Sequence, residues 1–142
     1  MTPAQFVTRE FLINDYESAT ALWQASEGVE ICEGDSKEEI ARYLQSNPGL
    51  SRVAEEAGAM VGAVLCGHDG RRGFIYHLAV ARAFRGRGVG KLLLADCISG
   101  LRTAGIKRAI ILVAGDNPTG HEFWLRNGWE DLAEAVPMAR DI

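Results

Sequence analysis

The stretch from Val80 to Lys91 reads V-A-R-A-F-R-G-R-G-V-G-K, and it decides the fold because of what lies on either side of it. Residues 74–80 form an almost continuous apolar strand, and residues 88–104 have the pattern of a helix that ends at Gly105. Residues 109–114 are another apolar strand. Strand, helix and strand in this order predict a right-handed crossover between two parallel neighbours.

The rest of the chain predicts helices and strands on both sides of this unit. In chain order we expect a helix from Asn14 or Asp15 to about Glu27, a helix from the capping box Ser36 and Glu39 to Asn47, strands at 52–57 and 60–66, a helix from Asn117 and Pro118 to about Asn127, and a strand at 136–139. The fold class is therefore α+β (α/β), with one mixed sheet.

Composition indicates one compact domain spanning residues 1–142. Hydrophobic residues make up 47% of the 142 residues, which is enough for a core. The amino end has no signal-peptide pattern and no segment is long enough to cross a bilayer, so we expect a cytoplasmic protein without a membrane partner. Cys32, Cys66 and Cys97 lie too far apart for a C-x-x-C motif, and no metal site is predicted.

Charge is distributed unevenly along the chain. The net charge is −4, but residues 1–60 hold 4 Lys/Arg against 11 Asp/Glu, whereas residues 61–142 hold 11 against 8. The basic half contains the glycine stretch, which favours a phosphate ligand there. A nucleic-acid partner is not expected, because this small excess is spread over many residues and few aromatic residues lie among the arginines.

The three glycines at positions 86, 88 and 90 predict a phosphate cradle. They lie where a strand ends and a helix begins, and helix N-termini offer unpaired N–H groups and a partial positive charge to anions. Glycine lets an anion come close to those N–H groups. Cations are supplied by Arg85, Arg87 and Lys91. The spacing fits neither a Walker A loop nor the dinucleotide fingerprint, and a glycine-rich turn without a ligand is the alternative.

The segment H-L-A-V-A-R-A-F-R-G-R-G-V-G-K-L-L-L resembles the acetyl-CoA-binding motif of the GNAT N-acetyltransferases, in which Arg or Gln is followed by two residues, Gly, one residue, and Gly or Ala. Arg85, Gly88 and Gly90 occupy that pattern. L-V-A-G-D-N-P-T-G-H-E-F-W-L-R-N-G-W is similar to the family's strand, Asn, helix and Gly-aromatic segment. The resemblance covers the chain from about Arg52 onward. It implies a mostly antiparallel sheet of about six to seven strands, flanked by helices, with a splayed parallel strand pair.

The resemblance also implies acetyl-CoA (coenzyme A) as the co-substrate. In the family, loop amides hold the pyrophosphate and a strand runs alongside the pantetheine arm. The residues carried over to the cofactor site are Leu78, Ala79, Val80, Arg85, Gly86, Arg87, Gly88, Val89, Gly90, Lys91 and Asn117. Asn117 has two compatible roles, since it precedes Pro118 as a helix cap and the family's matching Asn lies beside the pantetheine.

The implied reaction is N-acetyl transfer, in which an amine attacks the thioester directly and no acyl group is bound to the enzyme. The family often places an acidic Tyr where this chain has Trp124, which donates no proton. A non-catalytic acyl-CoA-binding sensor on the same fold is therefore the alternative. A thiolate is a tolerable leaving group without help, because its pKa is near neutrality.

Four side chains are candidates for proton transfer. Alternation along a strand predicts that Tyr76 shares a face with Phe74 and Leu78, and that His77 shares the other face with Ile75 and Ala79. Family catalytic residues on this strand tend to share the register of Phe74 and Tyr76. Tyr76 is therefore the first catalytic candidate and His68, in the preceding turn, is the second. We interpret His77 and His121 as structural or surface histidines.

The acceptor is expected to be a small-molecule or peptide amine. The segment E-G-V-E-I-C-E-G-D lies between the first two helices, where the family builds its acceptor wall. Its four carboxylates, Glu27, Glu30, Glu33 and Asp35, would attract a cationic amine, and a solvated loop is the alternative. Both a monomer and a homodimer are compatible with the sequence.

Overall fold

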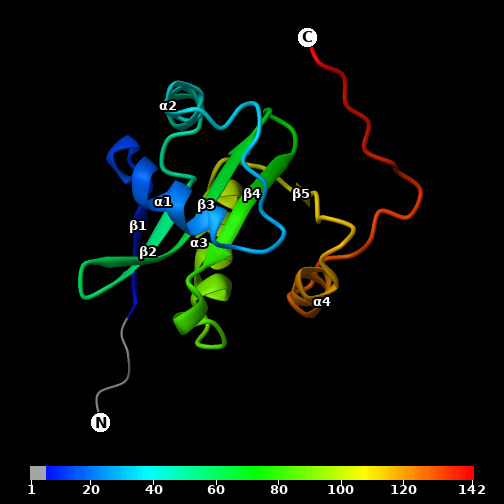
Figure 1. The fold of residues 1–142 in the computed structure, drawn as a ribbon. Helices are drawn as coiled ribbons and strands as arrows, with labels where there is room; N and C mark the ends of the chain where they lie inside the picture. The colour runs from blue at the N-terminus through cyan, green and yellow to red at the C-terminus, as the bar shows by residue number, and fades with distance from the viewer. Residues whose placement is uncertain (1–5) are drawn as a thin grey trace.

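The structure, a computed structural model, describes residues 6–142. The elements are β1 (Val7–Glu10), the short helix η1 (Ile13–Asp15), α1 (Tyr16–Gln24), α2 (Lys37–Ser46), β2 (Arg52–Glu56), β3 (Ala59–His68), β4 (Gly73–Val80), the short helix η2 (Arg82–Phe84), α3 (Val89–Thr103), β5 (Ala109–Ile111) and α4 (Pro118–Arg126). Figure 1 shows them gathered around one twisted sheet.

The sheet is mixed and mostly antiparallel, as predicted. Its strand order is β1-β2-β3-β4-β5, and only β4 and β5 are parallel, joined through α3. The sheet has five strands, fewer than the six to seven expected. The strand predicted at 136–139 does not form, and the C-terminal segment runs away from the sheet beyond α4 (Figure 1). Val136 and Met138 are 80% and 94% exposed, and Pro137 offers no N–H to a sheet partner.

Helices cover both faces of the sheet. The face under α1 and α2 buries Phe11, Ala19, Trp23, Ile40, Val53, Ala63, Leu65 and Ala79. The face under α3 buries Ala54, Val61, Val64, Ile75, Val89, Leu93 and Cys97, among others. All three cysteines are free, Cys66 and Cys97 in the core and Cys32 on the surface. The site described below lies at the edge of this two-sided core.

Local signals placed the ends of α2 and α3 correctly, whereas α1 ends at Gln24, before the expected Glu27, and Asp15 pairs with Arg9 instead of capping α1 with its side chain. Ser36 and Glu39 form the predicted capping box of α2, in which the Ser36 side chain accepts a hydrogen bond from the Glu39 N–H. Gly105 follows α3 with a φ of 82°. Residues 6–142 include no helix that is both long and apolar enough to cross a membrane, and the cytoplasmic location stays a prediction.

The parallel strands separate beyond Ile75 and Ile111, as the family resemblance implied. Their ladder runs from the pair Gly73 and Ala109 to the pair Ile75 and Ile111. β4 continues to Val80, whereas β5 ends at Ile111 rather than at the expected position 114. The edge of β4 from Leu78 onward therefore has no strand beside it on this side, which confirms the predicted splay.

A bulge in β4 overturns the predicted alternation. One residue separates Ala63 from Leu65 in β3, but two residues separate their partners, Ala79 and Tyr76. His77 takes up the extra length with a φ of 54°, a conformation that is uncommon outside glycine.

The faces of the strand are reassigned as a result. His77 lies on the same face as Tyr76 and contacts Trp23 of α1, with ring centroids 5.0 Å apart. Leu78 packs against the core under α3, together with Ile75. The prediction that Tyr76 shares a face with Leu78, and His77 with Ile75, was wrong because an extra residue reverses the alternation of every side chain after it.

Candidate active site

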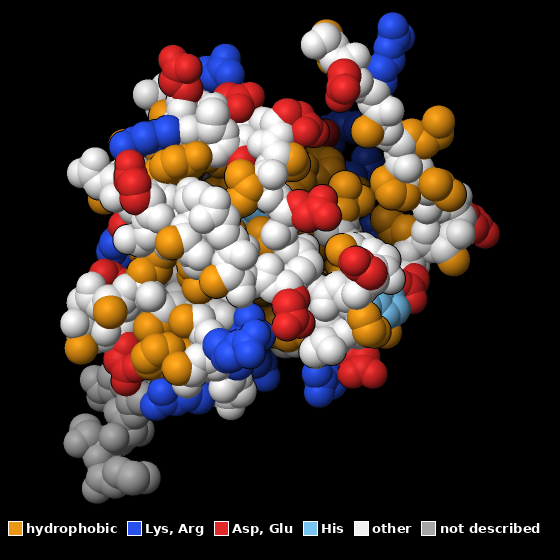
Figure 2. All heavy atoms as spheres, viewed as in Figure 1, with side chains coloured by type: hydrophobic (Ala, Val, Ile, Leu, Met, Phe, Trp, Pro, Cys, Tyr) orange, Lys and Arg blue, Asp and Glu red, His pale blue; other side chains and the backbone are white. Residues whose placement is uncertain are grey.

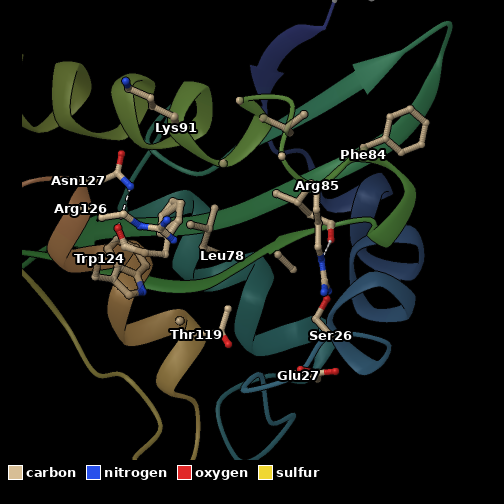
Figure 3. A pocket seen from close by; sticks show the side chains of 18 of the residues that line it. Ser26, Glu27, Leu78, Phe84, Arg85, Lys91, Thr119, Trp124, Arg126 and Asn127 are labelled. Atoms are coloured by element: carbon tan, nitrogen blue, oxygen red, sulfur yellow. Dashed lines mark hydrogen bonds between the residues drawn. The ribbon is translucent and has the colours of Figure 1, made fainter.

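A cleft of about 450 Å³ lies where β4 and β5 diverge (Figure 3). That volume is within the range of sites that bind small molecules. Four segments line it: the loop that follows α1, the second half of β4, the glycine loop with the start of α3, and α4. The lining residues are Ser26, Glu27, Leu78, Ala79, Val80, Phe84, Arg85, Gly86, Gly88, Val89, Gly90, Lys91, Asn117, Thr119, Gly120, Phe123, Trp124, Arg126 and Asn127.

The glycine loop has the backbone of an anion cradle. Gly86 and Gly88 have φ values of 77° and 85°, and a Cβ added to either would meet no atom within 4 Å. Both positions therefore need glycine for their conformation and leave open space beside the chain. The Leu92 N–H donates to the Gly88 carbonyl at 3.0 Å, which leaves the N–H groups of residues 89–91 ahead of the first bonded turn of α3. These groups and the helix dipole favour an anion.

The two arginines of the loop have different surroundings. Arg85 lines the cleft, and its Nε donates to the Val80 carbonyl at 3.1 Å (Figure 3). The Arg87 guanidinium instead lies over the rings of Phe6 and Phe84, 5.5 and 5.4 Å from their centroids. Arg87 is thus the one predicted cofactor residue that does not line the cleft in the described part of the chain.

Asn117 caps α4 and borders the cleft. Its side-chain oxygen accepts a hydrogen bond from the Gly120 N–H at 3.1 Å, which confirms the predicted cap. A Cβ placed on Gly28 would collide with the Asn117 side chain. The loop that follows α1 therefore reaches α4, so the two sides of the cleft meet at this contact.

Trp124 packs in the wall of the cleft. It is 8% exposed and makes edge contacts with Phe123 and Trp129, at centroid distances of 5.4 and 5.0 Å. The indole is therefore a structural part of α4, and this position carries no group that titrates near neutral pH.

The two predicted catalytic residues lie outside the cleft lining. Tyr76 stacks on Phe74 with rings 6.2 Å apart and faces Tyr43 of α2 at 6.5 Å. Burial raises the pKa of the Tyr76 phenol, although the residue is 38% exposed. His68 pairs with Gly73, at the end of β4 opposite the cleft. Its Nδ1 accepts a hydrogen bond from the Gly70 N–H at 3.0 Å.

Sequence reasoning missed a contact between the acidic segment and β4. His77 Nε2 lies 2.9 Å from an oxygen of Asp35, and the two side chains are 17% and 11% exposed. Asp35 is thus paired rather than free to attract an amine. No local signal reveals this pair, because it depends on the bulge and joins residues far apart in sequence.

The other three acidic residues of the segment, Glu27, Glu30 and Glu33, are exposed, which fits the alternative of a solvated loop. Glu27 also lines the cleft, and it lies 3.7 Å from Arg82 in an ion pair whose side chains are both 78% exposed. Such an exposed pair contributes little to stability. Acidic and basic side chains are interspersed over the face in Figure 2.

Sequence reasoning also missed most of the α4 wall. Its cleft residues are Thr119, Gly120, Phe123, Trp124, Arg126 and Asn127, and all except Arg126 recur at the spacing of one helix face. That spacing indicates one face of a helix, but it does not show that the face borders a cavity instead of the core.

Comparison with known proteins places this architecture in a family. Residues 13–129 match the profile described as the acetyltransferase (GNAT) family. An acetyltransferase of Sodalis glossinidius (strain morsitans) is 35% identical over 109 residues, covering 77% of this chain and 76% of the relative. One of Photorhabdus laumondii is 35% identical over 113 residues, with the same coverage of each chain.

Solved structures have the same fold. Ard1 from Thermoplasma volcanium has a TM-score of 0.77 and 26% identity, over 87% of this chain and 81% of that one. The aminoglycoside N-acetyltransferase AAC(6')-Iy, solved in complex with CoA, has a TM-score of 0.76 and 18% identity, over 99% of both chains. The profile match over most of the chain, together with relatives of this identity and coverage, shows that the protein belongs to the acetyltransferase (GNAT) family of acyltransferases.

Proposed function

We propose that the protein transfers an acetyl group from acetyl-CoA to a primary amine of a small molecule or peptide. One observation carries the proposal: a glycine loop at the start of α3 and an unpaired strand edge at Leu78–Val80 border the same cleft. The first feature suits a pyrophosphate and the second suits the amides of a pantetheine arm.

The residues of the cleft fit this co-substrate. The N–H groups of residues 89–91 would hold phosphate oxygens, and Arg85, Lys91 and Arg126 supply positive charge to the lining. The Val80 carbonyl now accepts from Arg85, so the guanidinium and a pantetheine amide would compete for that oxygen. The complex of AAC(6')-Iy with CoA supports acyl-CoA as the class of co-substrate.

The reaction requires little from the enzyme beyond positioning and proton transfer. The amine nitrogen attacks the thioester carbon, a C–N bond forms, and the C–S bond breaks with its electron pair remaining on sulfur. The nitrogen loses a proton to a base or water. Since burial raises the pKa of Tyr76, its phenol stays protonated at neutral pH and would donate a hydrogen bond or proton rather than accept one.

A cationic amine is the proposed acceptor. Glu27 lies in the cleft wall, and Glu30 and Glu33 are exposed on the same loop. An aminoglycoside acetyltransferase solved in complex with sisomicin has this fold with 16% identity and a TM-score of 0.75, which supports including aminoglycosides among the amines to test. The family model and the relatives are acetyltransferases and give no support to the sensor alternative, and release of free thiol separates the two functions.

A glycine substitution tests the cradle. Gly88→Val places a side chain beside the loop amides and should abolish acetyl-CoA binding measured by calorimetry. Gly58→Val is a matched control, because Gly58 has a φ of 82° and equally open surroundings in the turn between β2 and β3. Both variants incur similar backbone strain, but only the first touches the cradle. Unchanged affinity in a folded Gly88→Val protein would refute the proposed site.

The transferase activity is tested by thiol release from acetyl-CoA with a panel of amines. The panel contains an aminoglycoside, a polyamine, an amino acid amide and a peptide with a free N-terminus. At least one should stimulate thiol release above the hydrolysis measured without amine. A protein that binds acetyl-CoA and acetylates none of them would support the sensor function instead.

A further inference from the structure

We propose that His77, held by Asp35, accepts the proton of the attacking amine. The inference rests on the proposed transferase function. It starts from the pair itself: His77 Nε2 and Asp35 Oδ2 are 2.9 Å apart, and both side chains are largely buried between β4 and the loop that follows α1.

The bulge in β4 determines on which face of the sheet the His77 imidazole lies. His77 is one of only two non-glycine residues with positive φ in the described chain, the other being Ala57 in a turn. Without the extra residue, His77 would point into the core under α3. A residue held in an uncommon backbone conformation in the middle of a strand is often part of a functional site.

Asp35 is fixed as a hydrogen-bond acceptor. The same oxygen, Oδ2, accepts from the Cys32 N–H at 3.1 Å, and the Tyr16 hydroxyl donates to the Asp35 carbonyl at 2.6 Å. An ionised carboxylate only accepts hydrogen bonds, so in the neutral imidazole Nε2 carries the proton and Nδ1 keeps its lone pair. No hydrogen bond to Nδ1 is present among residues 6–142. The pair therefore presents a basic nitrogen with a defined tautomer, which is what a general base needs.

The location suits proton transfer from the acceptor. Leu78, the next residue, begins the part of β4 that lines the cleft, and Ser26 and Glu27 line it from the loop that ends at Asp35. His77 and Asp35 do not line the cleft themselves, but their pair joins the strand that borders the thioester site to the loop proposed for the amine. Asp35 is the titratable group in contact with the imidazole; Cys32 of the loop and Tyr16 of α1 contact Asp35, and Tyr76 is the preceding residue in β4.

The other candidates are less suited to accept this proton. Burial keeps the Tyr76 phenol protonated, and Nδ1 of His68 already accepts a hydrogen bond. His121 also pairs with a carboxylate, with Nε2 2.6 Å from Asp131, but those side chains are 44% and 63% exposed, whereas those of His77 and Asp35 are 17% and 11% exposed. His121 and Asp131 are therefore a matched control for the inner pair.

The first test compares the two pairs by thiol release at saturating acetyl-CoA, from about pH 5 to pH 9. His77→Gln should lower kcat about 100-fold, with acetyl-CoA affinity within about twofold of wild type. The loss of activity at acidic pH that an imidazole base causes should disappear from the pH profile of kcat/KM. Asp35→Asn should lower kcat about tenfold, and His121→Gln should match wild type. A folded His77→Gln protein with wild-type turnover and pH profile would overturn the proposal.

The second test does not need an acceptor. Nitrogen-15 NMR of the imidazoles in the full chain, with the His77 signal assigned by its loss in His77→Gln, should show the proton on Nε2 and a bare Nδ1 in the neutral ring. A proton on Nδ1 would overturn the proposal. If no amine is acetylated, the proposed function fails, and this tautomer still decides whether His77 is set up as a base.

Discussion

The glycine loop at 85–91 and the acidic loop at 25–36 border the same cleft, yet they are built in opposite ways. The glycine loop gets its shape from its own backbone, with Gly86 and Gly88 at positive φ and the first N–H groups of α3 following directly. The acidic loop is held by distant residues, since Asp35 pairs with His77 and Gly28 packs on Asn117. The comparison teaches that the shape of the glycine loop is set locally, whereas the acidic loop is positioned by contacts with residues far away in the sequence.

The largest effect is expected from detaching the acidic loop. Gly28→Val would push the loop away from Asn117, because a Cβ at Gly28 has no room. We expect turnover to fall about 100-fold, since small displacements of reacting groups are costly. Thiol release at saturating acetyl-CoA measures it. Gly34→Val, in the same loop with φ 92° and open surroundings, is the control. Equal losses of turnover in the two variants would mean that backbone strain in the loop, and not the lost contact with Asn117, causes the effect.

A smaller effect is expected at Tyr76. If its phenol only assists the departing thiolate, Tyr76→Phe should lower turnover about tenfold, less than a full general acid contributes. The affinity for acetyl-CoA should not change. Trp124→Phe, by contrast, should act mainly on the midpoint of thermal unfolding, because the indole packs between Phe123 and Trp129. Full activity in Tyr76→Phe would assign proton delivery to water.

The charges of the glycine loop should differ in their importance for binding. Lys91 lines the cleft, so Lys91→Met should weaken acetyl-CoA binding about fivefold, and less so at high salt. Arg87 stacks on Phe6 and Phe84 instead, so Arg87→Met should leave the affinity nearly unchanged. Calorimetry at two salt concentrations measures both. A larger loss in Arg87→Met would show that this side chain turns toward the phosphates.

The smallest effect is expected from the helix caps. Asn117→Ala and Ser36→Ala each remove a capping hydrogen bond and should each lower the free energy of unfolding by about 1 kcal/mol. Only Asn117→Ala should also weaken acetyl-CoA binding, by about two- to threefold. Chemical denaturation and calorimetry test the pair. Identical affinities would leave Asn117 with its capping role alone.

Features that depend on a few neighbouring residues were predictable. The capping box at Ser36, the cap at Asn117 and the helix start after Gly88 all follow from hydrogen bonds or φ values within one turn of chain. The order of the central strands and helices followed from hydrophobic periodicity. The conformation of the glycine loop at 85–91 could therefore be predicted from the sequence alone.

The sequence by itself thus determined the position of the glycine loop at the start of α3, the parallel crossover and the caps of α2 and α4, because each depends on the conformation of a short segment. Tertiary structure alone decided that β4 bulges at His77, that the ladder between β4 and β5 ends at Ile111, and that residues 136–139 stay outside the sheet. A bulge or the end of a ladder depends on the free energy of pairing with another strand. The residues that flank one position in the sequence do not reveal that pairing. The meeting of His77 with Asp35 belongs to the same class, since packing of α1 and its loop on the sheet brings the two together.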